Sequence, residues 1–143
     1  LLDLPSVPKT SGQKGLHVLV PIGGGQSVSQ ANELARRIGI MLQRALPDRV
    51  TTETSPDKRR GVVFIDTLQS FVGKMLVLPY SLRAVDGAPV SAPLAWDEVA
   101  PNLEPRAFTL ATMRKRLDAR GDLAAALLTG TVKLEPALAK LQV

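Results

Sequence analysis

The chain has 143 residues, enough for one domain with a substantial hydrophobic core. Hydrophobic residues make up 45% of the sequence and charged residues 22%, which excludes an intrinsically disordered chain. Cysteine is absent, so disulfide frameworks and thiolate metal sites are excluded. The net charge of +5 favours a polyanionic partner. No apolar run approaches the ~20 residues that a membrane-spanning helix needs.

The first half of the chain predicts a strand, a helix and a second strand. Residues 16–22 are strongly apolar and indicate a buried strand. A helix is expected over about 29–46, because apolar residues recur there with the helical period. Ser27 or Ser29 can cap its start, and Pro47 ends it.

The middle of the chain predicts short strands separated by loops. Residues 51–53 favour a short strand, and 55–60 form a polar, basic loop. Residues 61–66 indicate a central strand, and 75–80 indicate another with a proline near its end. A turn-rich connection rich in proline and glycine follows at 87–93.

Helices dominate the C-terminal part. A short helix is expected from Trp96, followed by helices over about 109–119, 122–129 and 133–141. Gly121 and Gly130 are the expected stops. The order of strands and helices predicts an α/β or α+β fold.

The segment from Ser11 to His17 carries the first candidate site. Lys14 and the amides around Gly12 and Gly15 are suited to phosphate oxygens, because glycine permits close backbone approach. Ser11 can donate a further hydrogen bond, and His17 alternates with apolar neighbours on its strand. The alternative is a flexible glycine loop that enters a strand whose histidine is only hydrogen-bonded.

The second candidate site is a carboxylate after a basic loop. Asp66 is the sole acidic residue in the 61–72 stretch, and a charge on a buried strand is costly unless it is paired or bound to a metal. Alternatively, Asp66 ends the strand and caps the next turn. The basic residues 58–60 form either a phosphate clamp or a solvated loop. Phosphate donors together with a carboxylate suited to a divalent metal indicate phosphoryl or nucleotidyl transfer.

Considered together, the motifs from about residue 4 to 117 resemble the polymerase domain of bacterial ligase D, a branch of the archaeo-eukaryotic primase superfamily. The matching stretches occur in the family's order: Leu4-Pro5-Ser6, Lys9-Thr10-Ser11-Gly12, Lys14-Gly15-Leu16-His17-Val18, Pro47-Asp48-Arg49, Val63-Phe64-Ile65-Asp66, Pro79-Tyr80-Ser81-Leu82-Arg83, Gly87-Ala88-Pro89-Val90-Ser91 and Trp96-Asp97-Glu98.

The resemblance implies roles for six residues. Three would hold the triphosphate of the incoming nucleotide, two would lie near the triphosphate or the primer terminus, and one would be the third metal-binding carboxylate of the catalytic centre. In that order these are Ser11, Lys14 and His17; Arg59 and Arg83; and Asp66. The implied cofactor is Mn²⁺ or Mg²⁺.

The chain also departs from the family pattern. The family's D-x-D pair lies roughly 30 residues before the serine and glycine loop, whereas only ten residues precede Ser11, so the pair is expected outside this chain. Gln69 and Val85 stand where the family often has positive charges. These departures leave enzymatic activity of this chain alone uncertain.

We therefore expect a single partial domain over 1–143 with a primase-polymerase-like mixed β-sheet flanked by helices. Its nucleotide-binding strand and loop would be 9–22, its metal-aspartate strand 61–67 and its C-terminal helices 108–141. The expected function is nucleotidyl transfer in end-joining repair, and the alternative is a non-catalytic module that binds nucleotide or DNA ends. By the same resemblance the partners are NTP or dNTP, DNA ends and, by analogy, Ku with a ligase module or a separate N-terminal half. The resemblance implies a cytoplasmic, nucleoid-associated bacterial protein and no membrane partner.

Overall fold

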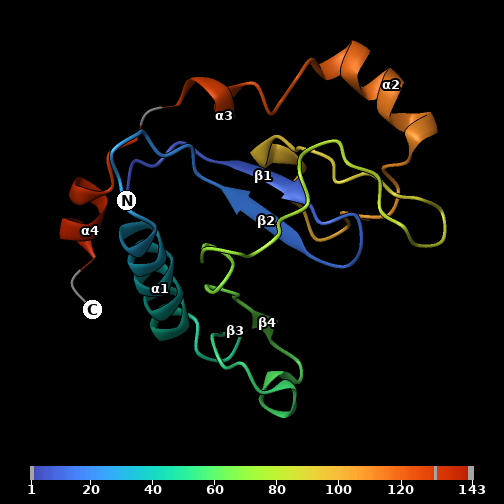
Figure 1. Ribbon diagram of the computed structural model, residues 1–143. Helices are drawn as coiled ribbons and strands as arrows, with labels where there is room; N and C mark the ends of the chain where they lie inside the picture. Colours follow the sequence, from blue (N-terminus) through green and yellow to red (C-terminus); the bar gives the residue numbers. More distant parts are fainter. Residues whose placement is uncertain (1, 131, 142–143) are drawn as a thin grey trace. The chain divides into compact units, whose positions relative to one another are not determined.

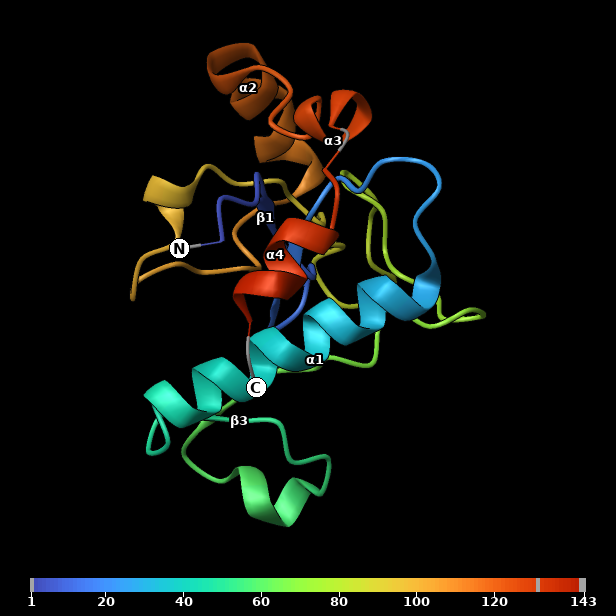
Figure 2. The ribbon, with the colours of Figure 1, turned by 90° about the vertical axis from the view of Figure 1, so that its left-hand side faces the viewer.

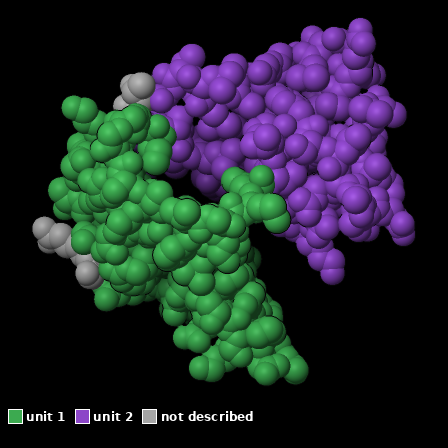
Figure 3. Space-filling view, viewed as in Figure 1, with its two compact units in different colours: residues 1–3, 22–76, 133–143 green, residues 4–21, 77–132 purple. Residues whose placement is uncertain are grey.

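A computed structural model describes residues 2–130 and 132–141. The chain divides into two compact units, which Figure 3 colours separately. Unit 1 comprises residues 1–3, 22–76 and 133–143, and unit 2 comprises residues 4–21 and 77–132. Figure 1 follows the elements along the chain.

Unit 1 is built on the long helix α1, Val28–Ala45, which confirms the helix predicted from the sequence. Ser27 caps its start: the Ser27 hydroxyl accepts from the Gln30 amide, and the Gln30 side chain accepts from the Ser27 amide. Leu34 and Gly39 are its buried residues. The C-terminal helix α4, Glu135–Lys140, lies beside α1 in Figures 1 and 2.

A short parallel sheet completes unit 1. Strand β3, Val50–Thr51, pairs with β4, Val63–Phe64, and the 3-10 helix η1, Pro56–Arg59, lies between them in the chain. Helix α1 packs closely here, since a Cβ at Gly39 would lie 2.7 Å from a Thr67 methyl group. The prediction of a central strand over 61–66 is wrong, because β4 pairs only with β3 among the described residues and Val63 is 65% exposed.

Unit 2 is built on an antiparallel hairpin. Strand β1, Val7–Thr10, pairs with β2, Leu16–Leu19. On its other side β1 meets the segment 89–94: the Thr10 amide donates to the Ala92 carbonyl at 2.9 Å, and the Leu94 amide donates to the Pro8 carbonyl at 2.8 Å. All four residues of β1 are therefore buried.

The strand over 16–22, predicted as buried, is exposed in part and ends at Leu19. Leu16 is 40% and Val18 56% exposed, because β2 has β1 on one side and no further strand beside it among the described residues. The buried strand of this hairpin is β1, for which the sequence predicted no strand.

The strand predicted over 75–80 is absent. In this segment Met75 is 95% and Leu78 69% exposed. Pro79 lacks a backbone donor, and Tyr80 adopts a positive φ of 65°, which takes the chain out of the extended conformation. The Tyr80 amide instead donates to the Ser91 carbonyl at 2.8 Å.

The C-terminal helices follow the prediction in number and order. They are the 3-10 helix η2, Trp96–Glu98, and the α-helices α2, Leu110–Arg120, α3, Ala126–Thr129, and α4. Thr109 caps α2, and Gly121 ends it with φ of 69°. Helix α3 is shorter than the predicted 122–129, because residues 123–125 form a turn.

The small sheets and the helices together confirm the mixed α/β fold class. In the part of the chain that the structure describes, no helix has the length and apolar character needed to cross a membrane.

Candidate functional site

The turn between β1 and β2 is closed by its own serine. The Ser11 amide donates to the Gly15 carbonyl at 2.8 Å, and the Ser11 hydroxyl oxygen accepts from the Gln13 and Gly15 amides at 3.2 and 3.1 Å. The Gly15 amide, which the sequence suggested as a phosphate donor, is thus engaged within the turn. Lys14 at the tip of the turn is exposed.

Arg83 packs against this turn. A Cβ atom at Gly12 would lie 2.4 Å from Arg83 Cγ and 3.4 Å from the Ser91 amide nitrogen. Gly12 also has φ of 71°, a conformation that glycine adopts without strain. Because residue 12 is glycine, the aliphatic stem of Arg83 can approach the backbone of the turn that carries Ser11 and Lys14.

His17 lies on β2 directly opposite Lys9 of β1 and is partly buried. The structure thus brings Ser11, Lys14 and Arg83 to one turn of unit 2, with His17 on the strand that follows the turn. A hydroxyl, an ammonium, a guanidinium and an imidazole are all groups that bind phosphate oxygens.

Arg59 belongs to unit 1 and is held in place by its surroundings. Its guanidinium lies over the Phe64 ring, 3.7 Å from the ring centre, and also donates to the Thr54 carbonyl. Its neighbours Lys58 and Arg60 are exposed, and Lys58 pairs with Glu53 at 3.6 Å. Of the basic loop predicted at 55–60, Arg59 is the cation with a fixed position.

Asp66, also in unit 1, lies two residues beyond β4 and is exposed. Its carboxylate accepts from the Leu68 amide at 3.0 Å and from the Gln69 side-chain amide at 2.6 Å. This is the turn-capping arrangement that the sequence left open. Gln69, which stands where the family often has a positive charge, contacts the predicted metal ligand directly.

A divalent cation of the Mg²⁺ type prefers oxygen ligands, and the exposed carboxylate of Asp66 supplies them. Each of its oxygens accepts one hydrogen bond and keeps capacity for a further ligand. No cluster of three or more His, Cys, Asp or Glu side chains suited to a metal ion occurs among the residues that the structure describes. Asp66 therefore fits one position of a metal site, and its role there stays a prediction.

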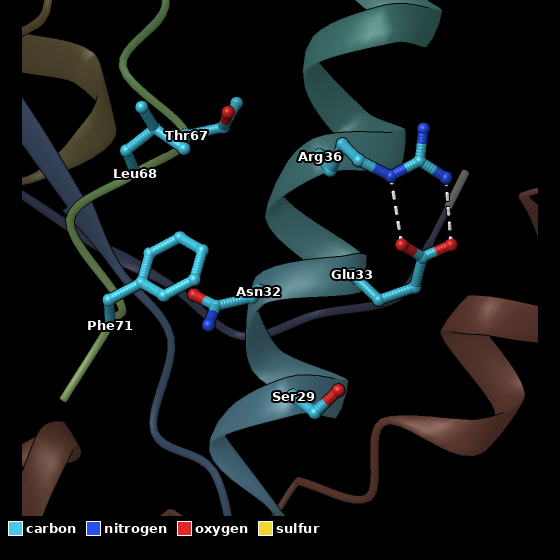
Figure 4. Close-up of a pocket in the computed structure, with 7 residues that line it drawn as sticks. All are labelled: Ser29, Asn32, Glu33, Arg36, Thr67, Leu68 and Phe71. Carbon is cyan, nitrogen blue, oxygen red and sulfur yellow. Dashed lines mark hydrogen bonds and ion pairs between the residues drawn. The ribbon is translucent and has the colours of Figure 1, made fainter.

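A cavity of about 400 Å³ lies between α1 and the segment after Asp66 (Figure 4). The carboxylate of Glu33 on its wall is paired with Arg36 and Arg37 at 2.8 and 2.7 Å, and hydrogen bonding to these groups lowers the pKa of Glu33 to about 2. The carboxylate at the cavity is thus paired with cations of its own helix. Its lining residues are Ser29, Asn32, Glu33, Arg36, Thr67, Leu68 and Phe71.

Sequence reasoning missed two residues of unit 2 that make long-range hydrogen bonds. Lys9 is fully buried and donates to the Ser91 hydroxyl at 2.6 Å. Tyr80 donates to Asp122 at 2.5 Å, and burial followed by this hydrogen bond raises its pKa to about 12. The only signal for either residue was its place in the quoted motifs, because Lys9 and Tyr80 lie 82 and 42 residues from their partners in the chain.

Comparisons with known proteins identify the family of this chain. The family model of the LigD primase-polymerase domain matches residues 1–124. The chain belongs to the LigD primase-polymerase family. The resemblance inferred from the motifs is thereby confirmed.

Two relatives of this family give the extent of the similarity. The chain is 43% identical over 126 residues to the multifunctional non-homologous end joining protein LigD of Mycolicibacterium smegmatis, covering 88% of this chain and 16% of that protein. It is 34% identical over 117 residues to the LigD of Pseudomonas aeruginosa, covering 82% of this chain and 14% of that protein. The matched part of the chain thus spans only 16% and 14% of the length of these relatives.

A solved structure shares the fold. The polymerase domain of Mycobacterium tuberculosis ligase D in complex with DNA superposes with a TM-score of 0.83 at 33% sequence identity. The superposition covers 92% of this chain and 45% of that domain chain.

Proposed function

We propose that this chain is the triphosphate-binding part of an end-joining primase-polymerase domain, which adds nucleotides from NTP or dNTP to DNA 3′ ends. The observation that supports this most is the packing of Arg83 against the Gly12 turn, which gathers Ser11, Lys14 and Arg83 in a chain of the LigD primase-polymerase family. DNA as the partner is supported by the related polymerase domain, which was solved in complex with DNA.

Each residue has a distinct task in this proposal. Lys14 and His17 would bind and neutralise the triphosphate, and Ser11 would donate its remaining hydroxyl proton. Arg83 of unit 2 and Arg59 of unit 1 would act near the triphosphate or the primer terminus. Asp66 would hold Mn²⁺ or Mg²⁺ as one ligand among several. When bound, such an ion neutralises charge on the phosphates and activates the attacking 3′ hydroxyl.

The setting would be double-strand break repair in the bacterial cytoplasm, at the nucleoid. Ku, a ligase module and a separate N-terminal half that carries the D-x-D pair are the proposed partners. In this proposal the other ligands of the metal site come from that N-terminal half.

A second candidate is a module that binds nucleotide or DNA ends without chemistry. The hydrogen bonds that Asp66 accepts favour this second candidate, because both carboxylate oxygens already have a donor within their own turn. The two candidates differ in whether bound nucleotide is transferred to a primer.

Calorimetric titration with GTP, with and without Mn²⁺, tests the nucleotide site directly. Micromolar binding that Lys14→Ala weakens and Lys115→Ala leaves intact would support a triphosphate site; Lys115 is an exposed lysine on α2. Primer extension by the same protein then separates the candidates. Binding with extension supports transfer, binding without extension supports the second candidate, and no binding contradicts both.

A further inference from the structure

Lys9 is a fully buried cation without an acidic partner. Its side chain is 0% exposed on β1, and its ammonium donates to the Ser91 hydroxyl at 2.6 Å. Among the described residues no carboxylate lies within ion-pair distance of it. A buried ammonium is costly unless it is compensated, so its retention in this fold calls for an anion.

The neighbourhood of Lys9 adds positive charge. Burial lowers the pKa of Lys9 to about 8, and the positive charge of Arg83 contributes to this shift as the second cause. The segment 89–94 that covers β1 contains no titratable side chain. Among the described residues, the charged or titratable neighbours of Lys9 include Arg83, whose charge acts on it, and His17, its register partner on β2.

A short series of contacts connects Lys9 to the phosphate turn. The Ser91 hydroxyl, which accepts from Lys9, itself donates to the Thr10 carbonyl at 2.8 Å. The Ser91 amide nitrogen lies 3.4 Å from the Cβ position of Gly12, beside the stem of Arg83. Lys9 is thus connected through Ser91 to the backbone that carries the phosphate-binding groups.

We propose that Lys9 is a positioning residue of the triphosphate site: it holds Ser91 beneath the Gly12 turn and supplies a buried positive charge that the triphosphate compensates. The inference rests on the proposed nucleotide binding. Lys9 does not touch the ligand, because it is fully buried; it acts through Ser91 and through its charge.

Two substitutions separate the two parts of this role. Lys9→Met keeps the apolar stem and removes the charge, and exchange of a buried charge for an apolar group of similar volume is often neutral for stability. Ser91→Ala keeps the charge and removes the contact with Lys9. Lys115→Ala, which removes an exposed lysine on α2, is the control for loss of one positive charge.

The experiment is calorimetric titration of each protein with GTP, GDP and GMP, alongside thermal unfolding. For Lys9→Met we expect an affinity loss of about tenfold for GTP, less for GDP and almost none for GMP, since the effect of a charge grows with the charge of the ligand. A purely structural role would weaken all three nucleotides equally or only lower the unfolding temperature. Equal losses, or a GTP affinity within about twofold of the wild type, would overturn the proposal.

A pH profile with another variant, Lys9→Gln, provides a second readout. Lys9 loses its proton as the pH rises through about 8, so the advantage of the wild type over Lys9→Gln in GTP affinity should shrink between about pH 7 and 9. His17 and Arg83 are the same in both proteins, so the difference isolates Lys9. A constant difference contradicts the charge role. If the wild type binds no GTP, both the proposed function and the inference about Lys9 are wrong. If the wild type binds GTP and the Lys9 variants bind it equally well, only the inference about Lys9 is wrong.

Discussion

At the scale of the residue, the turn from Ser11 to Gly15 separates groups that hold the turn from groups left for a ligand. The Ser11 hydroxyl oxygen accepts a hydrogen bond from the Gly15 amide. The Lys14 ammonium is exposed and forms no ion pair among the described residues. Lys14 and Arg83 therefore supply the charge at this turn, and Ser11 supplies its shape.

The variants Lys14→Ala and His17→Ala should each weaken GTP binding. Each change removes one hydrogen bond to a charged phosphate, which is worth about 1.5–3 kcal/mol, or roughly 10- to 100-fold in affinity. Calorimetric titration measures this loss, and thermal unfolding shows whether the fold persists. Unchanged affinity in both variants would refute the assigned roles.

Gly12→Ala should disturb the turn and its ligand together. Its Cβ would come within 2.4 Å of Arg83 Cγ, and its φ of 71° is unfavourable for alanine. We expect a loss of about 1–3 kcal/mol in the free energy of unfolding and weaker GTP binding. Gly24→Ala is the matched control, because nothing lies within 4 Å of its Cβ position. Equal urea-unfolding midpoints for the two variants would show that Arg83 does not pack on Gly12.

Asp66→Ala tests whether this carboxylate binds metal or only caps its turn. If it is a metal ligand, the variant should lose the enhancement of GTP binding by Mn²⁺ and keep its metal-free affinity. A purely capping role predicts a stability loss of about 1 kcal/mol with the enhancement intact. Asp66→Asn is the companion variant, since it keeps a side-chain oxygen for the Leu68 amide.

At the level of secondary-structure elements, α2 is joined to η2 by the half-buried pair Arg116–Glu98 and by the more exposed pair Arg120–Asp97 at 3.8 Å. Both terminal guanidinium nitrogens of Arg116 bond to the Glu98 carboxylate at 2.6 Å, and Arg116 also donates to the Pro93 carbonyl at 2.9 Å. The two side chains are 15% and 16% exposed. Hydrogen bonding to Arg116 is the first cause that holds the pKa of Glu98 below its ordinary value of 4.5.

This pair makes stability depend on acid pH. Because the pKa of Glu98 is lower in the folded chain than in the unfolded chain, the pair stabilises the fold above about pH 4.5, and its contribution disappears as the pH falls through the lower folded value. Glu98→Gln should lose about 2 kcal/mol at about pH 7 and progressively less in acid. Urea unfolding at several pH values measures this, with the exposed Asp118→Asn as control. A pH-independent difference would contradict the ionic contribution.

At the scale of the whole molecule, the chain corresponds to 45% of the related polymerase domain chain and carries six of the family's predicted site residues. Four of them, Ser11, Lys14, His17 and Arg83, lie in unit 2, and Arg59 and Asp66 lie in unit 1. Each group has its own experiment: titration with nucleotide for the first, and the metal dependence of that titration for Asp66.

Motifs and local sequence patterns were sufficient to predict the family and the helices. Ser27, Thr109 and Gly121 start or end helices through bonds to residues three or four positions away, so local rules find them. The burial of β1 and the exposure of β2 were decided only by tertiary structure. Lys9 meets Ser91 and Gly12 meets Arg83 across about 70 or more residues of chain. No local pattern encodes such contacts, because burial depends on which distant segment covers a strand.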